Sequence, residues 1–239
     1  MPGRLVIIPT FNEKENIREI TARVLGLQPD FDILIVDDGS PDGTAAIVKD
    51  LQGGAQGRLH LLERSGKLGL GTAYIAGFKW ALAKGYEHIF EMDADFSHNP
   101  DDLVRLYDAC AKHGGDMSVG SRYVSGGRVK DWSWDRVLLS FCASIYVRMV
   151  LWLGVRDTTA GFVCYTRRVL EALPLDEVRF IGYAFQIEMK YRVRRKGFRI
   201  VEVPITFIDR ERGTSKMNSS IFQEAIVGVL QMRFGGWIK

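Results

Sequence analysis

The chain lacks the features that mark several large protein classes. Its 239 residues include only three cysteines, Cys110, Cys142 and Cys164, and these form no CxxC pair or Cys/His spacing typical of zinc sites. Each cysteine has apolar neighbours, which predicts buried, reduced thiols and a reducing, cytoplasmic compartment. The formal net charge is only +3, so nothing in the charge balance indicates a nucleic-acid-binding protein.

Two common nucleotide-binding signatures are also missing. Residues 9–16, with the sequence PTFNEKEN, contain no glycine, which excludes the GxGxxG turn of a dinucleotide-binding Rossmann unit after the first apolar run. No GxxxxGK[ST] loop occurs in the chain. Residues 66–71, with the sequence GKLGLG, are either an ordinary turn into a helix or a loop that brings its amides and Lys67 near a phosphate.

A clear membrane span is missing as well. Met1 leads at once into a short apolar run, which is too short for a signal peptide and predicts a first strand. The apolar stretch 137–155 contains Arg148, and an arginine near the middle of a span costs about 2.5–3.5 kcal/mol on insertion scales. We therefore expect an amphipathic helix on a membrane or against the domain, with a true span as the alternative. Three tryptophans flank or end this stretch, as is typical of a membrane interface: Trp132, Trp134 and Trp152.

Short apolar runs alternate with amphipathic ones up to about residue 120. The runs 5–8, 33–36, 59–62, 88–92 and 117–119 predict strands. Helix start signals stand between them, at Asn12 with Glu15, at Ser40-Pro41 and at Asn99-Pro100. This alternation predicts an α/β fold with a mostly parallel central sheet and helices on both faces. Ligands of such sheets bind beyond the carboxyl ends of the strands.

Two carboxylates, Asp93 and Asp95, stand one residue apart at the end of the predicted strand 88–92. In an extended segment they point to the same face and converge. Because close carboxylates repel each other unless a cation or proton lies between them, we expect a hard divalent ion, Mg²⁺ or Mn²⁺. Taken alone, such a pair is more typical of a solvated turn, and the rest of the sequence shifts the balance toward a metal.

Six motifs follow one another along the chain: IPTFNE (8–13), VDDGSPDGT (36–44), GLGTA (69–73), MDAD (92–95), GSRY (120–123) and RERGTSK (210–216). Together they resemble the dolichyl- and polyprenyl-phosphate mannosyltransferases of glycosyltransferase family two, over nearly the whole chain. The resemblance implies a GT-A fold, in which an α/β sheet binds a nucleotide sugar. The implied reaction transfers mannose from GDP-mannose to dolichyl or polyprenyl phosphate, with inversion to a β-mannosyl phosphate.

The resemblance also implies how the chain is organised. A single GT-A domain would span residues 1–239, with 1–120 as the nucleotide-sugar-binding half and 121–239 as the acceptor-binding, membrane-associating half. Basic residues crowd the second half, which fits an anionic ligand or membrane surface. The protein would lie in the cytoplasm, peripherally attached to the cytoplasmic face of the membrane. Its expected partners are GDP-mannose, the lipid phosphate and the membrane surface, with no nucleic acid; a small membrane partner subunit stays open.

The metal and acceptor residues are carried over from the family by motif. Asp93, Asp95 and Ser97 would bind Mg²⁺ or Mn²⁺, although some family members have a glutamine at the position of Ser97. The acceptor phosphate is expected at Arg122, Arg136 and Ser140, of which the last two lie four residues apart on one helix face. The alternative for Arg136 is a solvated or membrane-facing cation. The expected catalytic residues are Asp93, Asp95, Arg122 and Arg136.

The donor is expected at a larger set of residues, chiefly in the first half: Pro9, Phe11, Glu13, Val36, Asp38, Lys67, Asp93, Ala94, Asp95, Arg210 and Lys216. Arg210, Arg212 and Lys216 predict a lid that closes on the diphosphate, with a solvated charge cluster as the alternative. Asp37 is open to a role as a strand-end cap. Glu188 either contacts the donor sugar or orients an arginine, and a structural ion pair explains it equally well. His98 is expected to cap a helix before Pro100 rather than approach the metal.

The acceptor chemistry needs little from the protein. A phosphate monoester is already an anion at neutral pH, because its second pKa is about 6, so no strong general base is required. The rival hypotheses are a polyprenyl-phosphate glycosyltransferase that uses UDP-glucose or another nucleotide sugar, a non-catalytic nucleotide-binding membrane module, and a nucleotidyltransferase. The sequence contains no QxxRW motif of processive relatives, which argues against polymer synthesis.

Overall fold

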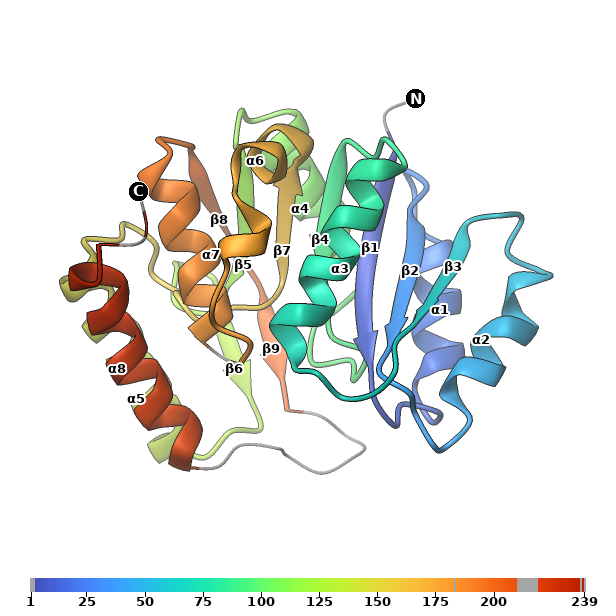
Figure 1. The fold of residues 1–239 in the computed structure, drawn as a ribbon, viewed down its shortest axis with the longest axis horizontal. Coiled ribbons are helices and arrows are strands. Elements are labelled where there is room, and N and C mark those ends of the chain that lie inside the picture. Colours follow the sequence, from blue (N-terminus) through green and yellow to red (C-terminus); the bar gives the residue numbers. More distant parts are fainter. Residues whose placement is uncertain (1–2, 183, 210–218, 237, 239) are drawn as a thin grey trace.

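The protein is described here by a computed structural model that covers residues 3–182, 184–209, 219–236 and 238, with the backbone alone for residues 219–225. A seven-stranded sheet in the order β3-β2-β1-β4-β7-β5-β8 forms its centre (Figure 1). The strands are β1 (Arg4–Thr10), β2 (Asp32–Asp37), β3 (Leu59–Glu63), β4 (His88–Glu91), β5 (Met117–Ser121), β7 (Val163–Thr166) and β8 (Ile200–Pro204). Their ladders are parallel except at β7, which runs antiparallel to β4 and β5. The predicted mostly parallel sheet and its five strands are confirmed.

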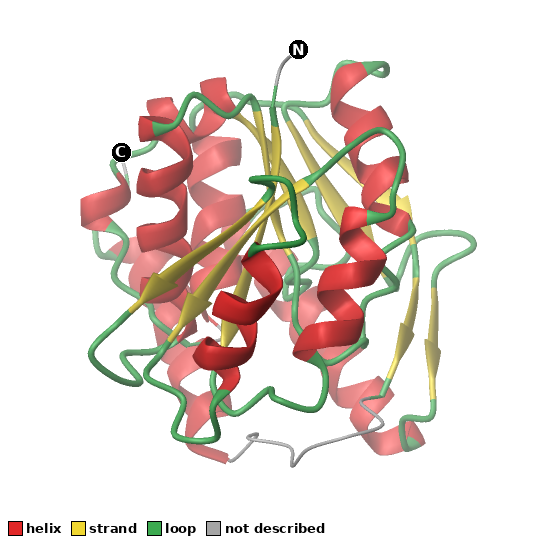
Figure 2. Cartoon of the chain, turned by 90° about the vertical axis from the view of Figure 1, so that its right-hand side faces the viewer, coloured by secondary structure: helices red, strands yellow, loops and turns green. Residues whose placement is uncertain are grey.

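Successive side chains of each central strand point to opposite sides, and helices cover the apolar side chains on both faces of the sheet. In β1, Leu5 and Ile7 join one core cluster, whereas Val6 and Ile8 join the other. The first cluster is covered by α3 (Leu70–Ala83), α6 (Arg167–Ala172) and α7 (Ala184–Arg195). The second is covered by α1 (Ile17–Leu25), α2 (Thr44–Gln52) and α4 (Asp102–Ala111). Figure 2 shows helices on both sides of the twisted strands.

Two further helices, α5 (Trp134–Leu151) and α8 (Ser219–Phe234), lie beside each other at one end of the molecule (Figure 1). Val147 of α5, Ile187 of α7 and Val229 of α8 share a third apolar cluster. The outer side of α5 and α8 stays apolar and exposed, and we call it the α5/α8 face: Trp134, Leu138, Leu139, Phe141, Met149, Trp152, Ile226, Val227, Leu230 and Phe234. No helix within the described residues combines the length and apolar character that a bilayer crossing requires.

The predicted helix starts are too early. The helices after β1, β2 and β4 begin at Ile17, Thr44 and Asp102 rather than near Asn12, Ser40 and Asn99. Asn12 has a left-handed φ of 62°, and its N–H donates to Ser40 Oγ at 3.0 Å. The loops after β1 and β2 therefore hold each other, instead of capping their own helices as the local sequence suggests.

The cysteine prediction is correct for two of the three residues. Cys110 and Cys164 are buried free thiols, whereas Cys142 is a free thiol that is exposed. Cys142 lies on α5, which is covered by protein on one side and presents the other side outward. Apolar neighbours in sequence predicted burial, but on this helix the apolar residues also form the exposed α5/α8 face.

Candidate active site

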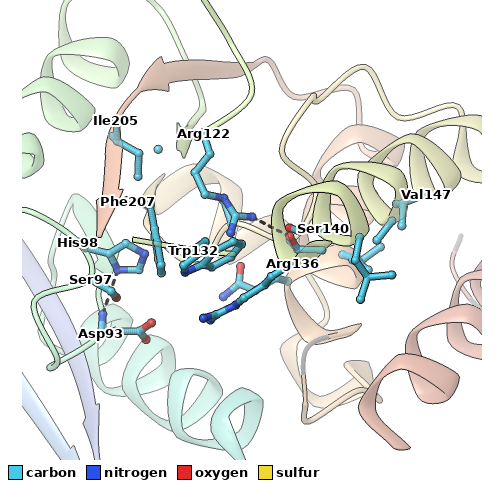
Figure 3. A pocket seen from close by; sticks show the side chains of 18 of the residues that line it. Asp93, Ser97, His98, Arg122, Trp132, Arg136, Ser140, Val147, Ile205 and Phe207 are labelled. Carbon is cyan, nitrogen blue, oxygen red and sulfur yellow. Dashed lines mark hydrogen bonds between the residues drawn. The ribbon is translucent and has the colours of Figure 1, made fainter. Parts of the chain in front are cut away.

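A cavity of about 430 Å³ opens beyond the carboxyl end of β4. Its walls come from both halves of the chain, including α3, the loop after β4, α5, α7 and β9 (Thr206–Ile208), which pairs in parallel with β6 (Arg128–Lys130). Figure 3 shows the loop residues Asp93 and Ser97 on one side and Arg136 and Ser140 of α5 on the other. The predicted metal and acceptor residues therefore face one space.

The acidic pair lies in an irregular loop, since β4 already ends at Glu91. Asp93 and Asp95 both line the cavity, and they do so from a loop rather than from a strand, while their convergence on one ion stays a prediction. Phe96 has a left-handed φ of 59° in this loop. One carboxylate oxygen of Asp95 accepts the backbone N–H of Ser97 at 3.1 Å, which fixes the turn and leaves the Ser97 side chain beside the pair.

Ser97 supports the metal assignment. Its hydroxyl oxygen is buried and has no hydrogen-bond partner in the described part of the chain. A buried polar group without a partner costs about 1–3 kcal/mol, so the position fits a group that gains its partner from a bound ligand. Asp93, Asp95 and Ser97 together offer the oxygen ligands that Mg²⁺ and Mn²⁺ prefer. The described residues contain no cluster of three or more His, Cys, Asp or Glu side chains for a metal, so water or substrate oxygens would complete this site.

His98 does not cap a helix, contrary to the prediction. The backbone N–H of Asp93 donates to His98 Nδ1 at 3.4 Å, and the imidazole stacks on Phe162 with ring centroids 4.8 Å apart. Burial lowers the pKa of His98 to about 4, against the opposing charge of Asp95. The imidazole is therefore neutral, and it supports the backbone of the metal loop. The turn before α4 is closed instead by Asn99, whose side-chain oxygen accepts the N–H of Asp101 at 3.2 Å.

Arg122 is held by Asp157, a residue that no sequence motif singled out. The Nε and Nη2 of Arg122 donate to the two carboxylate oxygens of Asp157, each at 2.7 Å, and Nη2 also donates to Thr159 Oγ1 at 2.9 Å. Asp157 is fully buried. Burial alone would raise the pKa of Asp157, but the charge and hydrogen bonds of Arg122 outweigh it and hold that pKa below its usual range. The guanidinium is thereby fixed at the cavity wall.

Arg136 and Ser140 lie one turn apart on α5 and both line the cavity, as their spacing predicted. Arg136 Nη1 pairs with Asp209 Oδ2 at 2.8 Å, so its charge is not simply solvated. The hydroxyl of Tyr123 donates to Ser140 Oγ at 2.7 Å. The structure therefore brings Arg122, Arg136 and Ser140 to one wall.

Trp132 lines the cavity, and its predicted interfacial position stays a prediction. Its ring lies against both arginines, with the centroid 4.0 Å from Arg136 Cζ and 5.4 Å from Arg122 Cζ (Figure 3). The indole nitrogen is buried and has no hydrogen-bond partner in the described structure. Trp134 and Trp152 are, by contrast, each 78% exposed, as an interfacial position requires. An aromatic ring this close to two guanidinium groups attracts both.

Of the predicted donor residues, Phe11, Glu13, Asp38 and Lys67 lie in the loops after β1, β2 and β3 and do not line the cavity, whereas Asp93 and Asp95 do. Asp38 pairs with Arg64 through Nε at 2.6 Å and Nη2 at 2.5 Å. Lys67 Nζ lies 5.2 Å from the ring centroid of Phe11, which brings two predicted residues together. Glu13 accepts a hydrogen bond from the Asn16 amide at 3.0 Å.

Several of the remaining donor assignments change or cannot be placed. The side chain of Val36 is fully buried in the core, and Ala94 is 4% exposed, so the structure leaves chiefly their backbone groups to a nucleotide. Pro9 is partly exposed, and its contact with the nucleotide stays a prediction. Asp37 accepts hydrogen bonds from the Ser40 backbone and hydroxyl, at 2.9 and 2.6 Å, which confirms its role as a strand-end cap. The predicted lid residues Arg210, Arg212 and Lys216 lie outside the described residues.

Gly69 and Gly71, at the start of α3, are required by backbone conformation and packing. A Cβ on Gly71 would lie 2.8 Å from the carbonyl oxygen of Phe180, and Gly69 has a φ of +100° that favours glycine. The N–H of Gly71 donates to the carbonyl of Ile181 at 2.9 Å. Of the two hypotheses for residues 66–71, the turn into a helix explains Gly69 and Gly71. Lys67 of the same segment lies beside Phe11.

A buried polar network lies beside the cavity, and no sequence pattern predicted it. Glu91 is fully buried and accepts hydrogen bonds from Gln186 Nε2 at 2.5 Å and Tyr165 Oη at 3.2 Å. Lys190 is also fully buried and donates to the Ala160 carbonyl at 2.6 Å and to Gln186 Oε1 at 3.3 Å. Burial raises the pKa of Glu91 to about 7 and lowers that of Lys190 to about 8. The network fixes the amide of Gln186, which lines the cavity.

The contacts of Glu188 favour a structural role over a contact with the donor sugar. One carboxylate oxygen pairs with Arg192 Nε at 2.8 Å, and the other accepts the backbone N–H groups of Arg179 and Phe180, each at 3.0 Å. The side chain is fully buried and does not line the cavity. Glu188 therefore orients an arginine and a loop rather than a donor sugar.

Comparison with known proteins gives a consistent result. The model of glycosyl transferase family 2 matches residues 5–173. The polyprenol monophosphomannose synthase of Mycolicibacterium smegmatis is 49% identical over 232 residues, which are 97% of this chain and 87% of that protein. The undecaprenyl-phosphate mannosyltransferase of Micrococcus luteus is 45% identical over 225 residues, with coverages of 94% and 91%.

Solved structures show the same fold at lower identity. The glucosyl-3-phosphoglycerate synthase of Mycobacterium tuberculosis, in complex with Mn²⁺, UDP-glucose and phosphoglyceric acid, superposes with a TM-score of 0.72 at 17% identity, over 98% of this chain and 80% of that chain. A structure of the same protein with Mg²⁺ and UDP gives a TM-score of 0.70 at 18% identity. This agreement confirms the GT-A-like architecture, and the chain belongs to glycosyltransferase family 2.

Proposed function

We propose that the protein transfers mannose from GDP-mannose to a polyprenyl or dolichyl phosphate, with inversion to a β-mannosyl phosphate. The observation that carries the proposal is one cavity that joins Asp93, Asp95 and Ser97 to Arg122, Arg136 and Ser140. A diphosphate at the first set and a phosphate at the second would face each other across a sugar. The relatives at 49% and 45% identity are named polyprenol monophosphomannose synthase and undecaprenyl-phosphate mannosyltransferase, which supports the mannose and the lipid phosphate.

The carboxylates at the cavity favour a phosphate acceptor over a hydroxyl acceptor. Three carboxylates line it among the described residues, Asp93, Asp95 and Asp209. The first two belong to the proposed metal site, and Asp209 pairs with Arg136. A sugar hydroxyl would need a general base, whereas a phosphate monoester is an anionic nucleophile at neutral pH. Guanidinium groups match its oxygens in geometry and charge, which suits Arg122 and Arg136.

Mg²⁺ or Mn²⁺ would be held by Asp93 and Asp95, with Ser97 as a direct or water-mediated ligand. When bound there, the ion supplies Lewis-acid stabilisation of the leaving diphosphate. The chain itself keeps the loop in place through Asp95, which accepts the N–H of Ser97, and through the neutral His98 that accepts the N–H of Asp93. In the proposed complex the nucleoside would rest against Pro9, Phe11, Glu13, Asp38 and Lys67.

The lipid part of the acceptor has a matching wall. Beyond Ser140 the cavity is lined by Leu139, Ala143, Tyr146 and Val147 of α5 and by Ile226 of α8. These residues continue into the exposed α5/α8 face. We propose that this face rests on the cytoplasmic surface of the membrane, so that the lipid stays in the bilayer while its phosphate reaches Arg136. Residues 1–239 would then act as one domain, because each half supplies one of the two anion sites.

A panel of donors tests the proposal. Purified protein, a short polyprenyl phosphate and Mn²⁺ or Mg²⁺ are incubated in parallel with GDP-mannose, UDP-glucose or UDP-GlcNAc, and lipid-linked sugar is measured. We expect product with GDP-mannose at a rate far above that with the other donors. Turnover of another donor in the absence of turnover of GDP-mannose would refute the mannose assignment but leave the acceptor assignment standing.

A further inference from the structure

Tyr74 of α3 carries a hydroxyl that the fold does not use. The oxygen is buried and has no hydrogen-bond partner within the described residues, and the residue as a whole is 1% exposed. Other tyrosine hydroxyls of the protein do have partners: Tyr86 donates to Asp32, Tyr123 to Ser140, Tyr146 to the Ile226 carbonyl and Tyr165 to Glu91. Tyr74 departs from this pattern at the wall of the cavity.

The ring of Tyr74 is fixed by its aromatic neighbours. It stacks on Phe185 with centroids 5.9 Å apart and an interplanar angle of 8°, and on Phe78 at 6.2 Å and 22°. A phenylalanine would make the same ring contacts without leaving a buried oxygen unpaired. Packing therefore accounts for the ring of Tyr74 but not for its hydroxyl.

The hydroxyl of Tyr74 can act as a hydrogen-bond donor. A phenol carries its proton at neutral pH, because its ordinary pKa is about 10. Tyr74 lines the cavity together with the metal-loop carboxylates and Gln186. The amide of Gln186 is already engaged by Glu91 and Lys190. Three side chains of the cavity lining hold a buried polar atom without a partner among the described residues: Ser97, assigned above to the metal site, Trp132 beside the two arginines, and Tyr74.

We propose that the hydroxyl of Tyr74 donates a hydrogen bond to a hydroxyl group of the transferred sugar and thereby contributes to donor selection. This inference rests on the proposed function, because it takes the sugar to lie between the diphosphate at Asp93 and Asp95 and the acceptor phosphate at Arg122 and Arg136. A sugar hydroxyl suits the position, since it accepts the phenolic proton and has a fixed place on the ring. A site built around such a bond discriminates against a sugar that lacks the hydroxyl, because the protein group is then left unpaired.

The substitution Tyr74→Phe separates this role from a structural one. We expect its melting temperature to equal or exceed that of the unsubstituted protein, because an unpaired buried hydroxyl is removed. We expect kcat/KM for the donor to fall on the order of 10- to 100-fold, as for the loss of one buried hydrogen bond at the transition state. The matched control is Tyr86→Phe. The hydroxyl of Tyr86 donates to Asp32 at 2.6 Å, and neither residue lines the cavity. That variant should lose thermal stability and keep kcat/KM.

A series of monodeoxy donor sugars identifies the contacted hydroxyl. The unsubstituted protein should discriminate strongly against one deoxy position, and Tyr74→Phe should lose that discrimination at the same position alone. Two results would overturn the proposal: unchanged kcat/KM in Tyr74→Phe, or an equal loss for the parent donor and every deoxy donor. The series is run with whichever nucleotide sugar the unsubstituted protein turns over. If the protein does not turn over GDP-mannose, the proposed donor is wrong. The comparison of Tyr74→Phe with the unsubstituted protein still tests the role of the Tyr74 hydroxyl.

Discussion

The carboxylate of Asp157 grips the guanidinium of Arg122 through two N–O contacts of 2.7 Å each, and a third bond joins it to the Arg122 backbone N–H at 2.9 Å. The Asp157 side chain is fully buried, and that of Arg122 is 8% exposed. Because breaking a buried pair leaves an uncompensated charge, Asp157→Asn should lower the free energy of unfolding by about 3–5 kcal/mol. The KM for the lipid phosphate should rise more than that for the donor. Urea unfolding and steady-state kinetics check the two effects.

The exposed pair of Arg23 and Asp101 supplies the control, since both side chains are 52% exposed. Asp101→Asn should change stability by less than about 1 kcal/mol. The contribution of Asp157 to stability should also depend on pH. The pKa of Asp157 is held below its usual value, so its contribution is complete above the unfolded value of about 3.9 and is lost as the pH falls through its folded pKa. A stability difference between the unsubstituted protein and Asp157→Asn that grew toward acid pH would contradict this account.

The metal loop gives the second prediction. Asp95→Asn keeps an oxygen that can accept the N–H of Ser97 but loses the charge, so the loop should persist while metal-dependent activity falls to background. Ser97→Ala removes the unpaired hydroxyl, so the fold should be as stable as before or more so. The Mn²⁺ concentration for half-maximal activity should nevertheless rise several-fold. Titration of each variant with Mn²⁺ and Mg²⁺ measures this, and full activity of Asp95→Asn at the usual metal concentration would exclude the metal role.

Arg136 should act on the acceptor alone. Arg136→Ala is expected to raise the KM for polyprenyl phosphate about 10- to 100-fold, as for the loss of charged hydrogen bonds worth about 1.5–3 kcal/mol. The donor KM should change little. Arg136→Lys should give an intermediate value, because an ammonium binds phosphate without the bidentate geometry. Arg128→Ala on β6, where the side chain is exposed and outside the cavity lining, is the control. Equal effects on donor and acceptor in Arg136→Ala would speak against the assignment.

The α5/α8 face predicts how the protein meets a membrane. Trp134 is 78% and Phe234 is 77% exposed, which favours burial of both in a bilayer interface. Replacement of both by serine should sharply reduce the fraction that floats with anionic vesicles. Activity on a short, water-soluble polyprenyl phosphate should be retained, because neither residue lines the cavity. Undiminished flotation would show that another surface mediates attachment.

Much of the fold was readable from the sequence because local patterns decide it. The apolar run of β1 has side chains in both core clusters, which is why an uninterrupted run predicted a central strand. The helix starts were misplaced because contacts between loops, such as that of Asn12 with Ser40, outweigh the local capping signals. Tertiary contacts of this kind leave no periodicity in the sequence.

The candidate site was readable where motifs carry it and hidden where distant residues complete it. Asp93, Asp95, Arg122, Arg136 and Ser140 were predicted and share one cavity. Asp157 lies 35 residues beyond Arg122, and no spacing connects the two before the chain folds. An isolated tyrosine in an apolar helix such as α3 is likewise indistinguishable from an ordinary core residue. Its unpaired hydroxyl becomes visible once the neighbours are in place.

A comparison of two lipid acceptors tests the central claim, that one cavity holds a lipid phosphate opposite a nucleotide sugar. The unsubstituted protein is supplied with radiolabelled GDP-mannose, metal ion and a polyprenyl chain that carries either a phosphate or a free hydroxyl. The account predicts labelled mannose on the polyprenyl phosphate in a linkage labile to mild acid, and none on the polyprenol. Equal transfer to the polyprenol, or no transfer to the phosphate while the protein remains folded, would contradict it.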